Sequence, residues 1–324
     1  MKQLFKSAVN RRVFTRNVAG TVAAACGLPN ESLLFAQDKT AAPGKTPAPE
    51  VPYKMSVMLW TVFTDLPFEQ RLEKVVEAGY HNVELVGEYS RWTEDEFRCI
   101  NAKRKELGIT FDCTAGLRHS LCDPDDRQAL VDQLRNTLPT MERLDCPTMI
   151  VLSGNKVPGL SPEAHHQSCI DTLKSTAALI QGKTINGEPV KLLLETIDPL
   201  ENPKIYLTQV EEALAIVEAV NHPQVQLLYD FFHEQIAAGN LIAKIEKALP
   251  RLALVHIADV PGRHEPGTGE IHYENIFRKL VEFNYKGMVA MEFHPTSDPV
   301  GKLRAASETA LRAGRNRTKL ISTD

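Results

Sequence analysis

The sequence lacks several features that would point to particular classes of protein. It has no Cys-x-x-Cys pair, and its six cysteines stand at irregular spacings, which predicts isolated thiols rather than a disulfide framework. It has no excess of basic residues, because the formal net charge is −4 and the pI is about 6.2. A nucleic acid would therefore gain no electrostatic attraction, and we expect a small-molecule substrate and no nucleic-acid partner.

A dinucleotide-binding motif is also missing. No Gly-x-Gly-x-x-Gly follows the first apolar segment, where such a fold would carry it. What is present is the composition of an ordinary globular protein, with 43% hydrophobic and 24% charged residues. The 324 residues suffice for one large α/β domain, since (β/α)8 barrels occupy about 250 residues, and no second domain is required.

The N-terminal residues resemble an export signal rather than part of the fold. Arg11 and Arg12 precede a weakly apolar stretch, residues 18–28, as in the twin-arginine signals that direct folded proteins across a bacterial inner membrane. This stretch is too short to span a bilayer stably, so we expect no integral membrane span. We predict a signal peptide over residues 1–36, cleaved after Ala36, and an exported, periplasmic protein; a basic N-terminus without signal function is the alternative.

Cys26 offers a second route to the membrane surface. Ala24 and Ala25 before it resemble a lipobox, although Ala23 stands where a leucine is expected. A lipid anchor at Cys26 is therefore the alternative to a cleaved signal. Residues 37–52 carry four prolines among alanine, lysine and threonine, and we predict a disordered linker there.

From Tyr53 onward, short apolar runs alternate with longer amphipathic ones, a pattern typical of βα units around a parallel sheet. The predicted strands are Met55 to Leu59, Asn82 to Val86, Thr110 to Thr114, Thr148 to Leu152, Val190 to Glu195, Gln226 to Asp230, Ala253 to Ile257 and Met288 to Glu292. The predicted helices include Pro67 to Ala78, Thr93 to Leu107, Asp123 to Leu144, Thr208 to Val220 and Tyr273 to Phe283. Eight such units predict an α/β (β/α)8 TIM barrel over residues 53–315 and a C-terminal tail over 316–324. A doubly wound open sheet is the alternative.

Each of the last four predicted strands ends in a residue that could bind a metal ion. These residues are Glu195, Asp230, His256 and Glu292. Functional side chains of a barrel project from the C-terminal ends of its strands, so the four should meet at one mouth. One carboxylate at a strand end is commonly a helix cap, but three carboxylates and an imidazole at one mouth carry a large desolvation and repulsion cost unless a cation holds them. We predict one divalent metal ion bound by all four.

The proposed ligands also suggest a chemistry. Three carboxylates with one nitrogen suit Mn²⁺, Mg²⁺ or Co²⁺ better than structural Zn²⁺. Such an ion can bind the oxygens of a hydroxy-carbonyl compound and stabilise the charge of an enediolate. Glu195 and Glu292, on well-separated strands, are the predicted acid-base pair, one abstracting a proton and the other returning it.

Further candidates lie just beyond these strands. His233, expected in the loop after the sixth predicted strand, could hydrogen-bond a substrate oxygen. Residues 259–270 place charged side chains between glycines and prolines directly after a strand, which is typical of a binding loop. Within this loop Arg263 could grip a carboxylate bidentately, and Glu265 could bind a hydroxyl or orient Arg263.

Other residues carry weaker signals. Glu84 and Glu88, near the end of the second predicted strand, could reach the same cavity, and Trp60 after the first could form an apolar wall. His165 and His166 begin a predicted helix, and we expect them on a solvated face rather than at a metal site.

Several of these segments together resemble a known family. They are the loop from Ala258 to Ile271, Leu194-Glu195, Asp230-Phe231-Phe232-His233 and Met291-Glu292-Phe293. From Tyr53 to the end of the barrel, the chain resembles the hydroxypyruvate isomerase family of xylose-isomerase-like TIM barrels, which is related to the ketose 3-epimerases. The resemblance implies metal ligands at all four strand ends, Glu195 and Glu292 as the acid-base pair, and His233 and Arg263 as substrate contacts. His256 is a departure, since some hydroxypyruvate isomerases carry glutamine there and histidine is the usual ligand of the epimerases; export is another.

The sequence thus predicts an intramolecular oxidoreductase, an aldose-ketose type isomerase that converts hydroxypyruvate or a similar compound by proton transfer through an enediolate. A ketose 3-epimerase would use the same two glutamates on a longer substrate. A phosphodiesterase of this barrel class would need more metal ligands on the early strands, where Leu59, Val86 and Thr114 offer none. A non-catalytic, secreted sugar-binding barrel would have no need of a proton-transferring pair. A homo-oligomer is neither required nor excluded.

Overall fold

The central sheet of this protein closes into a barrel. The computed structural model describes residues 51–321, so the predicted signal peptide and nearly all of the predicted linker lie outside the described residues. Around the barrel the parallel strands are β1 (Lys54–Met58), β10 (Met288–Met291), β9 (Leu252–Ile257), β8 (Val225–Asp230), β7 (Lys191–Glu195), β4 (Thr148–Leu152), β3 (Thr110–Thr114) and β2 (Asn82–Leu85). The predicted (β/α)8 barrel is confirmed, and the doubly wound open sheet is wrong.

The strand bounds agree closely with the sequence pattern. Strands β3 and β4 begin and end where predicted, and each end of the other six lies within one residue of its predicted position. The agreement has a simple cause, because these strands are largely buried and most appear in the sequence as short apolar runs; β2 and β3 each contain one buried carboxylate, Glu84 and Asp112.

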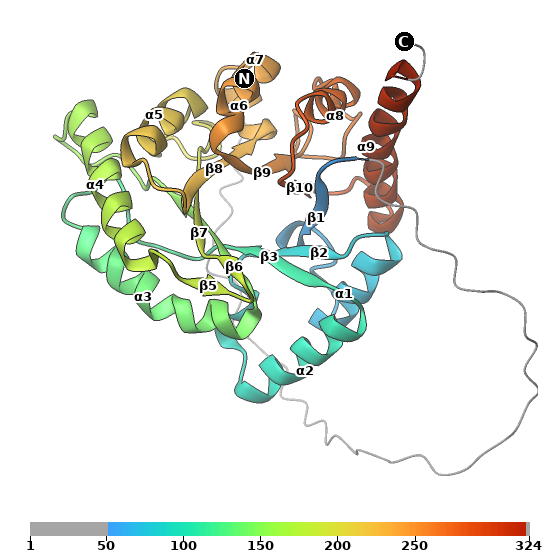
Figure 1. The fold of residues 1–324 in the computed structure, drawn as a ribbon, viewed down its shortest axis with the longest axis horizontal. Helices are drawn as coiled ribbons and strands as arrows, with labels where there is room; N and C mark the ends of the chain where they lie inside the picture. The colour runs from blue at the N-terminus through green and yellow to red at the C-terminus, as the bar shows by residue number, and fades with distance from the viewer. Residues whose placement is uncertain (1–50, 322–324) are drawn as a thin grey trace, which may run out of the picture. The chain divides into compact units, whose positions relative to one another are not determined.

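Helices surround the barrel (Figure 1). The α-helices are α1 (Phe68–Glu77), α2 (Glu94–Glu106), α3 (Arg127–Leu144), α4 (Pro162–Ile180), α5 (Val210–Val220), α6 (Phe231–Ala237), α7 (Leu241–Ala248), α8 (Tyr273–Glu282) and α9 (Pro299–Ile321). The 3-10 helices are η1 (Leu59–Thr61), η2 (Glu88–Arg91) and η3 (Leu249–Arg251). Helix α2 shows why such elements start where they do, since Thr93 and Glu96 form a reciprocal capping box at its N-terminus. Helix α9 continues past residue 315, where the predicted barrel ended.

Two features of the fold were not among the predicted elements. A small antiparallel hairpin, β5 (Thr184–Ile185) and β6 (Glu188–Pro189), precedes β7, and its turn residues Asn186 and Gly187 both have positive φ. Asparagine followed by glycine is the usual sequence of such a turn. Helix α6 begins directly at the end of β8, so His233 lies on a helix rather than in the predicted loop.

The barrel interior is filled by an apolar layer. Its members are Met58, Cys113, Ile150, Leu193, Leu228, Leu254 and Ala290, which come from seven of the eight strands. Side chains two residues apart on a strand point to the same side. The residues that follow this layer by two positions on the last four strands therefore also face the barrel axis, one layer nearer the C-terminal mouth.

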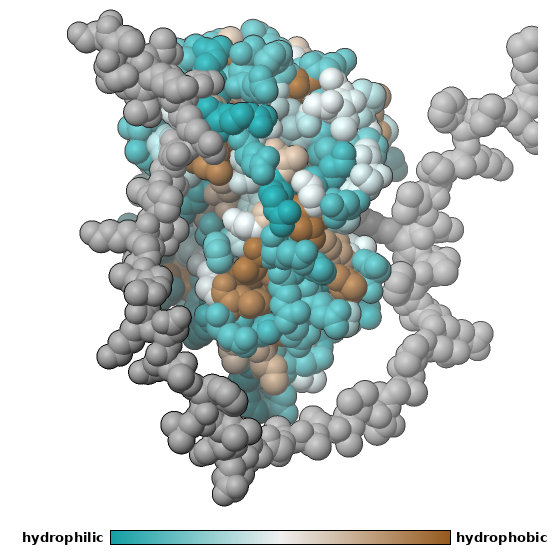
Figure 2. All heavy atoms as spheres, turned by 90° about the vertical axis from the view of Figure 1, so that its right-hand side faces the viewer, coloured by the Kyte–Doolittle hydropathy of each residue, from teal (hydrophilic) through white to brown (hydrophobic). Residues whose placement is uncertain are grey.

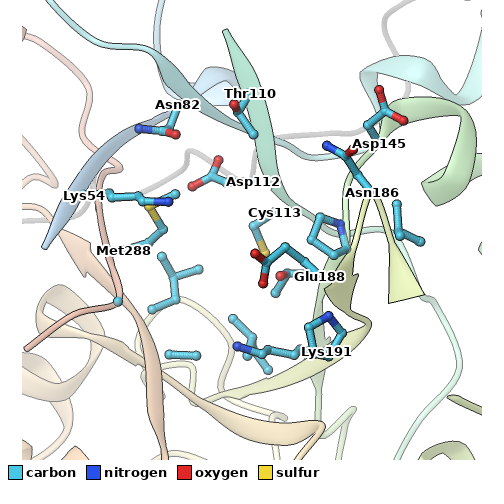
Figure 3. A pocket seen from close by; sticks show the side chains of 18 of the residues that line it. Lys54, Asn82, Thr110, Asp112, Cys113, Asp145, Asn186, Glu188, Lys191 and Met288 are labelled. Atoms are coloured by element: carbon cyan, nitrogen blue, oxygen red, sulfur yellow. The ribbon is translucent and has the colours of Figure 1, made fainter. Parts of the chain in front are cut away.

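A polar pocket opens at the opposite, N-terminal end of the barrel. Its volume is about 330 Å³, and Lys54, Asn82, Asp112 and Lys191 are among the residues that line it (Figure 3). Asp112 is buried, and its carboxylate accepts a hydrogen bond of 3.0 Å from Ser56. The apolar layer separates this end from the C-terminal mouth.

The described surface seen in Figure 2 is largely hydrophilic, and the thiols are isolated, as the sequence predicted. Hydrophilic residues cover most of the face in Figure 2, with small hydrophobic patches between them. Among residues 51–321, no helix is long and apolar enough to cross a membrane. Cys99 is exposed, the other four cysteines of this range are buried, and all five are free thiols. One expectation was wrong: His165 does not lie on a solvated face. It is buried, and its ring accepts a 2.8 Å hydrogen bond from the Val157 amide.

Candidate metal centre and active site

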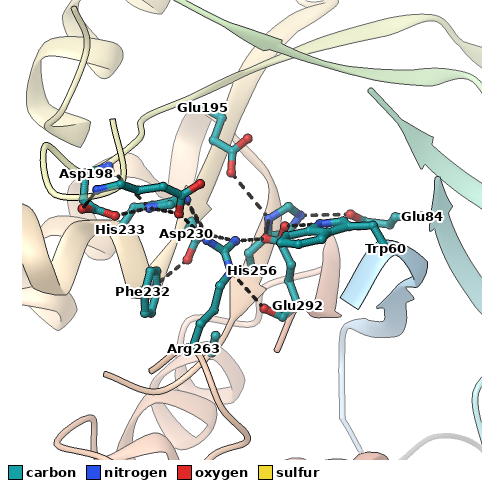
Figure 4. Close-up of polar contacts among 12 residues, drawn as sticks. Trp60, Glu84, Glu195, Asp198, Asp230, Phe232, His233, His256, Arg263 and Glu292 are labelled. Atoms are coloured by element: carbon teal, nitrogen blue, oxygen red, sulfur yellow. Dashed lines mark hydrogen bonds and ion pairs between the residues drawn. The ribbon is translucent and has the colours of Figure 1, made fainter. Parts of the chain in front are cut away.

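Four side chains meet at the C-terminal mouth of the barrel. Glu195 and Asp230 are the last residues of β7 and β8, His256 is the penultimate residue of β9, and Glu292 directly follows β10. All four are at least nine-tenths buried, and one donor atom from each lies within 4.8 Å of the donor atoms of the others. The structure thus brings together the four residues selected from the sequence, which we call the mouth cluster (Figure 4).

The donor atoms of the mouth cluster fit a divalent cation. Nδ1 of His256 lies 2.6 Å from Oε2 of Glu292 and 3.6 Å from Oε1 of Glu195. His256 Nδ1 and Glu292 Oε2 are buried, and although they lie close to each other, neither forms a hydrogen bond of normal geometry among the described residues. Buried polar atoms are normally hydrogen-bonded, so orphaned donor atoms that converge on one point are what a metal site presents. Three carboxylates and one imidazole are suitable ligands for such an ion.

The charges at the mouth cluster perturb one another strongly. Burial raises the pKa of Glu195, and the nearby His256 only partly opposes this effect. Burial alone would also raise the pKa of Glu292, but Arg263 and His256 outweigh it and hold that pKa well below its usual range. Burial would lower the pKa of His256, whereas the carboxylates of Glu292 and Glu84 raise it well above its ordinary value. The carboxylates are thus offset by a protonated imidazole and a guanidinium, which is positive charge that a cation could supply instead.

His233 lies beside the mouth cluster on the first turn of α6. Its Nδ1 is 2.7 Å from Oδ2 of Asp198, and its Nε2 is 3.3 Å from Oδ2 of Asp230. Burial would lower the pKa of His233, but the two aspartates outweigh it and raise the pKa to about 9. His233, Asp198 and Glu201 form the only other group among the described residues whose spacing could hold a metal ion. Asp198 and Glu201 were missed from the sequence, because nothing in the pattern indicated that the loop after β7 folds over His233.

Arg263 reaches into the same site from the loop after β9. It is buried, and its Nη2 lies 2.7 Å from Glu292 Oε2 and 3.2 Å from Asp230 Oδ2. Its Nη1 lies 3.1 Å from Oε2 of Glu201. The centre of its guanidinium stands 5.6 Å from the ring of Trp60, which itself donates a 2.8 Å hydrogen bond to Glu292. The predicted binding loop therefore supplies a fixed positive charge to the mouth.

The other charged residue selected from this loop has a different environment. The carboxylate of Glu265 accepts hydrogen bonds from the backbone and side chain of Thr296 and lies 2.7 Å from Nζ of Lys302 on α9. These contacts tie the loop to the helix and leave the carboxylate outside the mouth cluster. A substrate contact for Glu265 stays a prediction that the structure does not support.

Asp259 organises the loop from within. Its Oδ2 accepts hydrogen bonds from the amides of Gly267 and Gly269, both at 2.9 Å, and its Oδ1 accepts from Val260 at 2.9 Å and Ile271 at 3.0 Å. Gly269 is needed at its position, because a Cβ there would lie 2.0 Å from the carbonyl oxygen of Val260. The composition of the loop indicated binding, but the structural role of Asp259 was not predicted.

The weaker candidates near the first strands divide into two groups. Glu84 lies inside the barrel and contacts His256, whereas Glu88 lies 3.8 Å from Arg71 at the barrel edge. Trp60 flanks the site as expected, but it also acts as a hydrogen-bond donor. The sequence could place Glu84 on a strand but could not identify its partner, which is 172 residues away.

Comparison with known proteins supports a relationship over most of the barrel. The family model described as xylose isomerase-like TIM barrel matches residues 72–317. A 2-oxo-tetronate isomerase of Pectobacterium atrosepticum is 30% identical over 259 residues, which cover 76% of this chain and 95% of that protein. Hydroxypyruvate isomerase of Escherichia coli is 26% identical over 255 residues, which cover 78% of this chain and 97% of that protein.

The fold of a solved structure is also similar to that of this protein. The crystal structure of a protein described as AP endonuclease, family 2, from Brucella melitensis is similar with a TM-score of 0.68 and 26% identity, covering 79% of this chain and 98% of that one. In every case nearly the whole of the similar protein is matched. The likeness therefore includes the strands that carry the mouth cluster.

Proposed function

Because this chain belongs to the xylose isomerase-like TIM barrel family and its curated relatives are isomerases, it is an isomerase, and we propose that it acts on a short hydroxy-carbonyl acid such as hydroxypyruvate with the help of one divalent metal ion. The observation that carries the proposal is the convergence of Glu195, Asp230, His256 and Glu292, whose donor atoms lie within 4.8 Å of one another at the barrel mouth.

An acidic substrate is favoured by the charges around the mouth cluster. Arg263 contributes a guanidinium that is buried beside Glu292. Nε2 of His233 lies 3.2 Å from Nη1 of Arg263, and the pKa of His233 is raised to about 9. In the proposed complex these two groups bind the carboxylate and a hydroxyl of the substrate. The guanidinium would then share its interactions between the protein carboxylates and the substrate.

The proposed ligands of the metal are the four residues of the mouth cluster, and Mn²⁺, Mg²⁺ or Co²⁺ suits them better than Zn²⁺. When bound, the ion would polarise the substrate carbonyl and offset negative charge on the substrate oxygens.

Proton transfer is assigned to the two glutamates of the mouth cluster. One glutamate removes a proton from the hydroxyl-bearing carbon, and the electron pair of that C–H bond forms the C=C bond of an enediolate. The other glutamate delivers a proton to the former carbonyl carbon, while a proton moves between the two oxygens, so that the product is an isomer of the substrate. Glu195 and Glu292 suit these roles because both carboxylates are buried at the mouth, on strands β7 and β10 or directly after them, and approach the same point from different sides of the barrel.

A ketose 3-epimerase activity is the second candidate, and His256 is the residue that favours it. The sequence resemblance assigns histidine at this position to epimerases more often than to hydroxypyruvate isomerases. The same two glutamates would then remove a proton from one carbon of a longer sugar and return it to the opposite face of that carbon, so the substrate and the carbon that receives the proton would differ.

One experiment separates these candidates. The chain with Mn²⁺ is incubated in D₂O with hydroxypyruvate, trioses and ketohexoses, and products and deuterium incorporation are followed by NMR. We expect turnover of hydroxypyruvate with deuterium at the reacting carbon, and loss of both in Glu195→Gln. Turnover of ketohexoses alone would replace the first candidate with the second, and binding without deuterium incorporation would favour a non-catalytic sugar-binding barrel.

We also propose that the chain is exported, on the evidence of Arg11 and Arg12 ahead of the apolar stretch 18–28. In a bacterial host, the protein should appear in the periplasmic fraction and shift to the cytoplasm when both arginines are replaced by lysine. Incorporation of a labelled fatty acid that is lost in Cys26→Ser would favour the lipid anchor. An unchanged distribution in the lysine variant would contradict twin-arginine export.

A further inference from the structure

Strand β2 interrupts the apolar layer of the barrel interior with a carboxylate. Seven strands contribute apolar side chains to that layer, and the eighth, β2, contributes Glu84 at the same level. The register establishes this position, because Glu84 pairs with Met58 on one side and with Cys113 on the other. Its exposed fraction is 0%.

The energetic cost of this carboxylate demands an explanation. A buried carboxylate is expensive unless it is paired, and an apolar residue of similar volume would complete the layer without that cost. Oε1 of Glu84 has no hydrogen-bond partner among the described residues. Its other oxygen, Oε2, lies 2.9 Å from Nε2 of His256, and this is its single strong contact. The position of Glu84 is therefore accounted for by His256 alone.

The contact determines which nitrogen of His256 faces the mouth. When Glu84 is ionised, as the positive charge of His256 favours, its carboxylate only accepts hydrogen bonds, and Nε2 then carries the proton that it donates to Glu84. Nδ1 is then the nitrogen left to face the other carboxylates, and it does lie toward Glu195 and Glu292, at 3.6 and 2.6 Å (Figure 4).

We propose that Glu84 is a positioning residue for the metal centre: it holds the His256 ring by its Nε2–H so that Nδ1 is presented as the metal-binding nitrogen. The inference rests on the proposed function for the metal itself, and it adds a residue from outside the four-ligand set. Carboxylates that hold metal-binding histidines in this way typically change metal affinity by 10- to 100-fold when they are replaced.

Metal affinity provides the first test, measured on the full chain by Mn²⁺ titration with electron paramagnetic resonance of the free ion. Glu84→Leu removes the acceptor and completes the apolar layer, and Glu84→Gln keeps the shape and an acceptor oxygen but removes the charge. We expect the Kd for Mn²⁺ to rise roughly 100-fold in the leucine variant and about 10-fold in the glutamine variant. Circular dichroism checks that each variant is folded, and the glutamine variant keeps the test decisive if the leucine variant does not fold.

Asp112→Asn is the matched control. Asp112 is also a buried carboxylate inside the barrel, but its hydrogen bond comes from Ser56, and it interacts with His256 only through its charge, without a hydrogen bond or ion pair to any of the four ligands. Its Kd for Mn²⁺ should stay within about twofold of that of the unmodified chain. A loss of affinity equal to that of Glu84→Gln would mean that any buried carboxylate has this effect, and it would overturn the positioning role.

The histidine ring itself provides a readout that a general loss of packing would not imitate. In metal-free protein with ¹⁵N-labelled histidine, the Nε2–H signal of His256, assigned by its absence in His256→Gln, should be shifted downfield by its hydrogen bond to Glu84. The signal should move upfield in Glu84→Gln. An unchanged signal would overturn the inference.

The two proposals fail in different ways. If the unmodified chain does not bind Mn²⁺, the proposed metal-dependent function fails. If it binds Mn²⁺ and both folded Glu84 variants bind within twofold of it, the role of Glu84 fails while the proposed function stands.

Discussion

Nη2 of Arg263 lies 2.7 Å from Oε2 of Glu292, so a cation from the loop after β9 neutralises part of the mouth cluster. The same nitrogen also lies 3.2 Å from Asp230. The rings of Trp60 and Phe232 flank the guanidinium at 5.6 and 4.9 Å from its central carbon and hold it in place. A divalent ion would supply positive charge to the same carboxylates. Removing either cation should therefore destabilise the fold most when the other is absent.

Arg263→Gln should therefore lower the melting temperature of the metal-free protein and enlarge the gain from added Mn²⁺. Removing the cation from a buried ion pair costs up to about 3 to 5 kcal/mol, and because His256 and His233 still contact the two carboxylates, the shift should be no more than about 10 °C. Thermal melts with EDTA and with Mn²⁺ measure both quantities. Arg278→Gln, which removes an exposed pair with Glu282, is the control and should respond to Mn²⁺ like the unmodified chain. Equal Mn²⁺ responses in all three proteins would contradict the shared electrostatic role.

Glu292→Gln should keep the fold yet lower kcat by about 10²- to 10⁴-fold, because the amide cannot take up or return a proton. Glutamine retains an oxygen for the hydrogen bond from Trp60, so the wall of the site should be preserved. NMR turnover measurements with hydroxypyruvate, together with circular dichroism, test this expectation. Glu246→Gln, at an exposed position on α7, is the control and should leave turnover unchanged. Turnover within tenfold of the unmodified rate would exclude Glu292 from proton transfer.

The mouth cluster could be predicted from the sequence for a geometric reason. Once the apolar runs are assigned to parallel barrel strands, the residues at their C-terminal ends must converge, whatever the details of packing. Glu195 and Asp230 stand at such ends, and the alternation of side chains along a strand places them on the axis. Their donor atoms could thus be brought together without any knowledge of long-range contacts.

Several contacts of the site residues could not be predicted, because periodicity does not encode them. Glu84 faces His256 because the barrel is closed: β2 and β9 are separated by β1 and β10, and their side chains meet in the barrel interior. Asp198 meets His233 because α6 starts without a linker, where the Asp230 side chain caps the amide of Phe232. Glu265 was predicted to bind a substrate hydroxyl or to orient Arg263; its contact with a lysine on the last helix was not predicted, and the substrate contact stays a prediction.

Glu265 should stabilise the fold in a pH-dependent manner. Burial would raise its pKa, but Lys302 and Thr296 outweigh it and lower the pKa from 4.5 to about 2. A lowered carboxyl pKa means that the folded state is favoured by the ionised form, so the stabilisation is complete above about pH 5 and is lost as the pH falls toward 2. Glu265→Gln should therefore cost on the order of 1 to 3 kcal/mol at pH 7 and almost nothing near pH 2.

Urea unfolding at a series of pH values measures this difference. Glu308→Gln, at an exposed position on the same helix as Lys302, should give a small and pH-independent change. A cost for Glu265→Gln that is as large near pH 2 as at pH 7 would mean that packing, rather than the charge of Glu265, ties the loop to α9.

Asp259→Asn should disturb catalysis through the loop rather than through the mouth cluster. The asparagine NH₂ would face amides that now donate to a carboxylate oxygen, so two hydrogen bonds to a charged group, each worth about 1.5 to 3 kcal/mol, are replaced by donor-donor contacts. The loop would then hold Arg263 less firmly, which should raise KM for hydroxypyruvate at least tenfold while the Kd for Mn²⁺ changes little. Hydrogen exchange over residues 259–271 should increase in parallel.

Thr268→Ala is the control: it removes one side-chain hydrogen bond from the same loop, to the Glu265 carbonyl, and should change KM much less. If Asp259→Asn instead weakened Mn²⁺ binding as much as it raised KM, the loop and the metal centre would be one cooperative unit, and a role for Arg263 separate from the metal would be wrong.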